Sequence, residues 1–243
     1  MSGGPPQASQ PAAAAADSKS RASSSAWRWP ASAWTWAALA VTLGLGSLVV
    51  FGLERWGAAS DWRPSLALDW QPSLSGSQPW RAWSAGLVHF SELHLAANLA
   101  GCVLVAALGL AARVPTRCVV AWALAWPALH LGLWVQPALT HYGGLSGVLH
   151  AGVAVVAVHL LLRPSRAQRR IGALVLAGLA MKLLGEAPWA GAISHPAGWD
   201  VAVAPLAHVS GALAGLVMAG LAEALHLGWN CVREALGAID AHD

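Results

Sequence analysis

Charged residues are scarce in this chain: Asp, Glu, Lys and Arg make up 10% of its 243 residues, whereas hydrophobic residues make up 56%. A soluble domain usually carries about a quarter charged residues. Several uncharged stretches reach the roughly 18 residues that a helix needs to cross the hydrocarbon core of a bilayer. This composition excludes an ordinary soluble domain and predicts an integral membrane protein with helical spans.

Cysteine is also rare, and Cys102, Cys118 and Cys231 are widely spaced without a Cys-x-x-Cys pair. This spacing argues against a disulfide framework and against a zinc site, and we expect neither a metal nor a cofactor. The net charge of +3 comes from short basic clusters between apolar stretches. Such clusters are typical of membrane topology and not of a phosphate-binding face, so nucleic acid is not an expected partner.

The chain divides into three predicted parts. Residues 1–30 hold mainly Ala, Ser, Pro and Gly, and we expect a disordered cytoplasmic segment because such a composition cannot build a core. Residues 31–228 are predicted to form one all-α transmembrane domain, followed by a short cytoplasmic tail at 229–243. The six predicted spans cover 34–53, 86–111, 118–136, 145–162, 171–187 and 204–226.

Basic residues orient these spans. With the N-terminus in the cytoplasm, ten of the 14 Lys and Arg residues fall on the inner side and three on the outer side, while Lys182 lies within the fifth predicted span. Positive residues concentrate in the cytoplasmic loops of membrane proteins. Both termini are therefore predicted to be cytoplasmic. The long connection 54–85, with five tryptophans, is predicted to lie outside and partly in the interface.

Polar residues of three predicted spans fall at a similar depth near the outer face. His94 is expected about two turns below the outer end of the second span, with Asn98 one turn deeper on the same face. Ser146 begins the fourth span, and His208 lies about one turn into the sixth. Because polar groups are costly at this depth unless they find partners, we expect these side chains to face one another.

These residue types suit acyl transfer. A serine hydroxyl needs a base to accept its proton, and histidine has a suitable proton affinity, so Ser146 and His208 are the candidate catalytic pair. The oxyanion that forms needs preorganised donors, which Asn98, His94 and the backbone N–H of Ser146 would supply. The neighbouring Gly144 is grouped with this oxyanion site.

Small residues are predicted to bring the two catalytic helices together. Gly211 and Gly215 follow His208 on its own helix face, and Gly147 follows the serine; such stripes allow close helix packing. His150, one turn below Ser146, is expected to support the site by packing against the ring of His208. No acidic residue is predicted to orient His208, which favours a Ser–His dyad over a triad.

The motifs resemble those of the rhomboid family of intramembrane serine proteases, from about residue 80 to 222. The matching positions, in family order, are Trp80-Arg81, His89, His94, Asn98, Gly143-Gly144-Leu145-Ser146-Gly147, Ala207-His208, Gly211 and Gly215. By this resemblance the fold is a six-helix rhomboid-like bundle, Ser146 is the nucleophile, His208 the base, and His94 and Asn98 the oxyanion stabilisers. The implied location is a bacterial cytoplasmic membrane, with the active site toward the outer face.

Two further features resemble the rhombosortase branch of that family: His150 after Gly-Leu-Ser-Gly-Val-Leu, and Lys182-Leu-Leu-Gly-Glu186 in the fifth span. The resemblance implies substrates anchored by a C-terminal Gly-Gly, a transmembrane helix and a basic tail. Lys182 and Glu186, four residues apart, are expected to pair, and they are candidate substrate-docking residues.

The sequence leaves several alternative roles open for these residues and for the protein. Ser146 and His208 taken singly are often interhelical hydrogen-bonding residues. Within the family, a generalist protease with other single-span substrates and an inactive protein that binds transmembrane helices are both open. A transporter is disfavoured because the polar residues stop at one depth. A metalloprotease or aspartyl protease is disfavoured because the chain lacks His-Glu-x-x-His and paired intramembrane aspartates.

Overall fold

The computed structural model describes Met1 and residues 30–56 and 64–240, so the predicted disordered segment lies almost wholly outside the described residues. The described chain is helical, and its only extended pairings are isolated bridges. The long helices are α1 (Ala31–Trp56), α4 (Glu92–Ala112), α5 (Thr116–Leu133), α6 (Ser146–Leu161), α7 (Arg166–Gly185) and α8 (Pro205–Asp240). Each of them overlaps one predicted span.

Three of these helices are long and apolar enough to cross a membrane by length and composition: α1, α4 and residues 205–234 of α8. The helix α6 is apolar but has 16 residues, which is shorter than a usual span. The all-helical architecture of the described residues thus agrees with the sequence, whereas the six-span topology stays a prediction.

Helix ends differ most from the predicted ones at the start of α4 and at the end of α8. The second predicted span begins at 86, but α4 begins at Glu92 because the Ser91 hydroxyl caps the helix and accepts from the backbone N–H of His94 at 3.1 Å. His94 therefore lies in the first turn of α4 and not two turns below its end. The helix α8 continues to Asp240, so the predicted tail begins inside a helix that runs well beyond residue 226.

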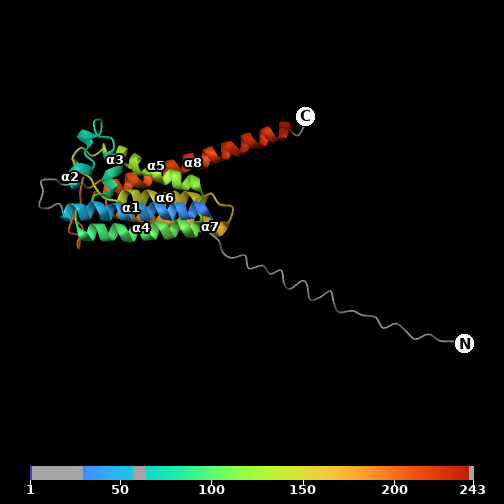
Figure 1. Ribbon diagram of the computed structural model, residues 1–243, viewed down its shortest axis with the longest axis horizontal. Helices are drawn as coiled ribbons and strands as arrows, with labels where there is room; N and C mark the ends of the chain where they lie inside the picture. Colours follow the sequence, from blue (N-terminus) through green and yellow to red (C-terminus); the bar gives the residue numbers. More distant parts are fainter. Residues whose placement is uncertain (2–29, 57–63, 241–243) are drawn as a thin grey trace.

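The long helices run side by side, and the described part of the predicted outer connection, between α1 and α4, covers one end of the bundle (Figure 1). This connection contains α2 (Pro64–Leu68), η2 (Pro72–Leu74), α3 (Arg81–Ser84) and η3 (Ala85–Leu87). A buried ion pair holds it together, with Arg81 Nη1 2.9 Å from Asp69 Oδ1. The Asp69 carboxylate also contacts His141 Nδ1 at 2.6 Å, which ties the connection to the segment preceding α6.

The core of the bundle is built around α6, which is hydrophobic on all sides and contributes eleven buried residues. Tryptophans fill the space between α6 and its neighbours. Trp122 of α5 donates its indole N–H to the carbonyl of Val148 in α6 at 2.8 Å, and its ring contacts that of Trp36 from α1, with ring centroids 4.3 Å apart. These contacts hold the first turns of α6, where Ser146 lies, against the neighbouring helices.

Candidate active site

Ser146 is the first residue of α6, and the chain before it is fixed by backbone hydrogen bonds to the outer connection. Tyr142 exchanges two such bonds with Trp70, at 2.7 and 2.9 Å, and Gly144 N–H donates to the carbonyl of Ala85 at 2.9 Å. Gly144 has φ +129, a conformation that side-chain-bearing residues rarely adopt. The first N–H groups of a helix have no partner within it, so Ser146 lies beside available donors at a positive helix end.

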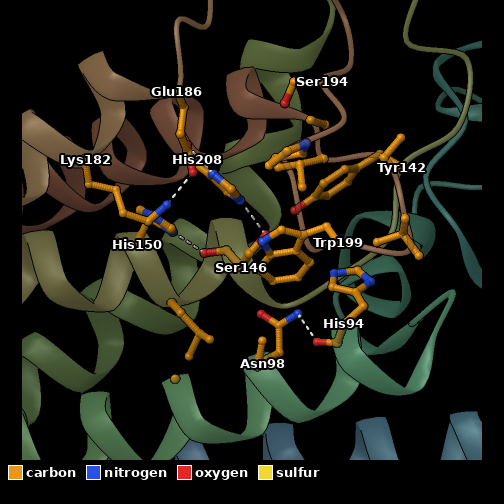
Figure 2. Close-up of a pocket in the computed structure, with 18 of the residues that line it drawn as sticks. His94, Asn98, Tyr142, Ser146, His150, Lys182, Glu186, Ser194, Trp199 and His208 are labelled. Atoms are coloured by element: carbon orange, nitrogen blue, oxygen red, sulfur yellow. Dashed lines mark hydrogen bonds and ion pairs between the residues drawn. The ribbon is translucent and has the colours of Figure 1, made fainter.

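His208 of α8 lies directly opposite this serine. Its Nε2 is 2.8 Å from Ser146 Oγ, and Figure 2 shows the two side chains pointing toward each other. The helices α6 and α8 can approach closely because the facing residues of α8 are glycines. A Cβ on Gly211 would lie 2.0 Å from the carbonyl oxygen of Gly147, and one on Gly215 would lie 2.4 Å from that of Ala151. The predicted close packing of these two helices through glycine is confirmed.

His150 packs on the ring of His208, as the sequence predicts. The two rings are stacked with centroids 4.4 Å apart and an angle of 9° between their planes. The other contact of His150 is with the serine itself, because its Nδ1 lies 2.6 Å from the backbone carbonyl oxygen of Ser146. A neutral ring that donates from Nδ1 to this carbonyl would therefore be fixed in place one turn below the serine.

The expectation that no acidic residue would orient His208 is wrong. Glu186, the C-cap residue that follows α7, places Oε2 2.6 Å from His208 Nδ1. Its other oxygen, Oε1, accepts from the ammonium of Lys182, so the predicted Lys182–Glu186 pair is confirmed. The sequence places Glu186 near the outer end of the fifth span, but it does not show that the end of α7 faces the first turn of α8.

His94 and Asn98 of α4 line the same cavity as Ser146 and His208. In Figure 2 they lie on the other side of Ser146 from Glu186. The His94 ring packs against Gly144, since a Cβ there would be 2.7 Å from Nε2. Asn98 is buried and donates one amide hydrogen to the carbonyl of His94 at 3.0 Å. Its second amide hydrogen is free to donate a hydrogen bond to an oxyanion.

The cavity has a volume of about 1160 Å³ and extends beyond the predicted residues. The segment between α7 and α8 covers it, where Ser194 and Val203 exchange two backbone hydrogen bonds at 2.8 and 2.9 Å. Trp199 from this segment lines the same cavity as Ser146, and both are labelled in Figure 2. Neither this segment nor Tyr142 was predicted from the sequence to belong to the site. A signal existed for the latter, because it is the one tyrosine of the chain and directly precedes Gly143-Gly144.

A second group of buried polar side chains lies toward the opposite end of the bundle. Cys118, His159 and Glu223 place one potential ligand atom each within 4.8 Å of the others. However, the Arg117 guanidinium lies 2.9 Å from Glu223 Oε1 and already balances its charge. These contacts join α5, α6 and α8, far along the helices from Ser146.

A search of curated proteins found no match. A family model described as the rhomboid domain matches residues 76–224, which is more than half of the chain and includes the Gly-Gly-Leu-Ser-Gly segment, α4 and the first turns of α8. The chain therefore belongs to the rhomboid family, whose members are typically intramembrane serine proteases.

Proposed function

We propose that this protein is an intramembrane serine endopeptidase in which Ser146 is the nucleophile and His208 the general base. The observation that carries the proposal is the 2.8 Å contact between His208 Nε2 and Ser146 Oγ, within a cavity that also contains His94 and Asn98. Nucleophile and base must be within hydrogen-bonding distance for proton transfer. This contact also argues against an inactive helix-binding protein, which would have no need of an aligned pair.

The proposed reaction has two steps. Ser146 Oγ attacks the carbonyl carbon of a substrate peptide bond while His208 Nε2 takes the hydroxyl proton. His208 then gives this proton to the leaving amine, which leaves an acyl-enzyme. Water, or another nucleophile activated by the same histidine, then attacks the ester carbonyl, which releases the acyl group and restores the hydroxyl. Because the peptide bond must be accessible, we expect substrate helices that unwind readily near small residues.

Asn98, His94 and the backbone N–H of Ser146 are proposed to bind the oxyanion of the tetrahedral intermediate. Replacing Asn98 with alanine is expected to lower kcat by about 100-fold to 1000-fold, the range for loss of one oxyanion donor. The measurement is the initial rate of reporter cleavage by purified protein, with Asn230→Ala on the exposed part of α8 as the control. An unchanged rate for Asn98→Ala would show that other groups bind the oxyanion.

The proposed topology has six spans with both termini in the cytoplasm of a bacterium and the site toward the outer face. Two observations support it. The first residue of α1 and the last residues of α8 lie toward the same end of the bundle, opposite the outer connection (Figure 1). The basic segments 113–117 and 163–170 lie at helix ends away from Ser146, where the positive-inside rule expects the cytoplasm.

The proposed substrates are membrane-anchored proteins with a C-terminal Gly-Gly, a transmembrane helix and a basic tail. Support comes from the resemblance of residues 145–150 and 182–186 to rhombosortases, and residues of both segments line the cavity. The alternative is a generalist protease that cleaves other single-span proteins. A substrate with two glycines can enter a narrow site in an extended form at little steric cost.

Two reporters co-expressed with the protein test this choice. One carries a Gly-Gly/helix/Arg tail, the second carries the same tail with Gly-Gly replaced by Leu-Leu, and each is also paired with the Ser146→Ala variant. We expect Ser146-dependent cleavage of the first reporter alone, seen as a size shift on an immunoblot. Equal cleavage of both would favour the generalist protease and overturn the proposed requirement for diglycine.

A further inference from the structure

Three neighbours fix the ring of His208. Its Nε2 is 2.8 Å from Ser146 Oγ, its Nδ1 is 2.6 Å from Glu186 Oε2, and one face stacks on His150. The side chain of His208 is 8% exposed and that of Glu186 is 21% exposed. A ring that is held at both nitrogens and on one face has little freedom to rotate about its χ2 torsion.

The Glu186 contact also determines which nitrogen carries the proton. An ionised carboxylate can only accept hydrogen bonds, so Nδ1 of a neutral His208 must be the protonated nitrogen. The unprotonated Nε2 then faces Ser146 Oγ, as a general base requires. From this geometry we infer that Glu186 is a positioning residue for His208, which makes the site a Ser–His–Glu triad. The inference rests on the proposed function of Ser146 and His208.

Lys182 has a defined part in this arrangement. Its ammonium binds Glu186 Oε1, one helical turn away, while Oε2 is left for His208. The two contacts use different oxygens and thereby fix the plane of the carboxylate. The ammonium also balances a negative charge that would otherwise be costly near apolar helices. Lys182 and Glu186 thus form a clamp on His208, a role that does not require either of them to touch the substrate.

Glu186 also lowers the energy of the transition state in which His208 takes the proton of Ser146. When His208 accepts the proton of Ser146, it becomes a cation that lies beside the Glu186 carboxylate. The attraction between these charges stabilises the transition state more than the ground state, in which the ring is neutral. The carboxylate keeps its own charge throughout, and the proton stays on the ring until the leaving group takes it.

The test uses the full-length protein in detergent and a fluorescent fluorophosphonate probe, which needs no knowledge of the natural substrate. Ser146 Oγ attacks phosphorus, fluoride leaves, and His208 takes the hydroxyl proton. Glu186→Gln keeps the side-chain volume but loses the charge, and we expect its second-order labelling rate constant to fall by roughly 100-fold. The matched control is Glu92→Gln, which changes an exposed carboxylate at the same end of the bundle.

The labelling rate constant and the fraction of protein that is labelled distinguish a positioning role of Glu186 from a purely structural one. If Glu186 only joined α7 to α8, Glu186→Gln would lower the fraction of labelled protein and the Tm but leave the rate constant of the folded fraction within about twofold of wild type. That result would overturn the inference. If the Gln variant does not fold, Glu186→Asp and Glu186→Asn, which differ only in charge, replace it. Faster labelling of the Asp variant supports the inference, and equal rates overturn it.

Failure of the proposed function gives a different result. Wild-type protein that does not label, or that labels as fast as Ser146→Ala, would overturn the roles of Ser146 and His208, and the triad with them. Ser146-dependent labelling of wild type with an unaffected Glu186→Gln variant would overturn the role of Glu186 alone.

Discussion

Replacing Ser146 with alanine is expected to abolish proteolysis while the protein still inserts and folds. In the proposed mechanism, the variant loses the oxygen atom that forms the acyl-enzyme, and neither His208 nor Asn98 can replace it. When residues act as a catalytic unit, loss of the nucleophile removes on the order of 10⁶-fold in kcat. The substitution removes one oxygen from a side chain at the wall of the cavity. The helix should survive, because alanine is favourable in helices and the N-cap of α6 is Leu145.

The measurement compares cleavage of the Gly-Gly reporter by wild type and Ser146→Ala at equal membrane levels. Size-exclusion profiles and Tm values of the purified proteins show whether folding is intact. Ser77→Ala serves as the control, because Ser77 is exposed in the outer connection and bonds only locally to Leu74. Turnover by Ser146→Ala at a rate comparable to wild type would remove Ser146 from the mechanism.

Much of the site was predictable because polar residues are conspicuous in an apolar sequence. A serine and two histidines within largely apolar helices must find partners, and the positive-inside rule brought them to one depth without reference to any motif. The glycines after His208 gave the second clue, since helices can approach closely only where side chains are small. The 2.8 Å contact between Ser146 and His208 joins residues 62 positions apart, and both clues were needed to place them together.

The Glu186 contact could not be predicted in the same way. Spacing within one helix reveals pairs such as Lys182 and Glu186, because residues four apart share a face. It does not reveal how that face is rotated relative to another helix. The rotation of α7 depends on its packing against α6, where a Cβ on Gly172 would lie 2.9 Å from the carbonyl oxygen of Ala157. The start of α4 was misplaced for a simpler reason: hydrophobicity continues through residues 85–90, whereas the Ser91 cap sets the helix end.

Replacing Gly211 with alanine is expected to disrupt both packing and catalysis. The added Cβ would lie 2.0 Å from the carbonyl oxygen of Gly147 and 2.7 Å from its carbonyl carbon. These are backbone atoms in the first turn of α6, so the overlap cannot be relieved by a change of rotamer, and α8 must move away. Overpacking of this kind costs about 1–3 kcal/mol of stability or more, which we expect to appear as a lower Tm.

The same displacement would separate the proposed catalytic pair, because Gly211 lies one turn from His208 and Gly147 is the residue after Ser146. A shift of about 1 Å in a catalytic geometry can cost 100-fold in rate, so Gly211→Ala should label with fluorophosphonate at least 100-fold more slowly than wild type. The matched control is Gly220→Ala on the same helix, where a Cβ would meet nothing within 4 Å. It gains the helix propensity of alanine and should keep full activity. A Gly211→Ala protein with wild-type Tm and labelling rate would mean that α6 and α8 do not approach as closely as these distances require, and the proton transfer proposed between Ser146 and His208 would lose its structural basis.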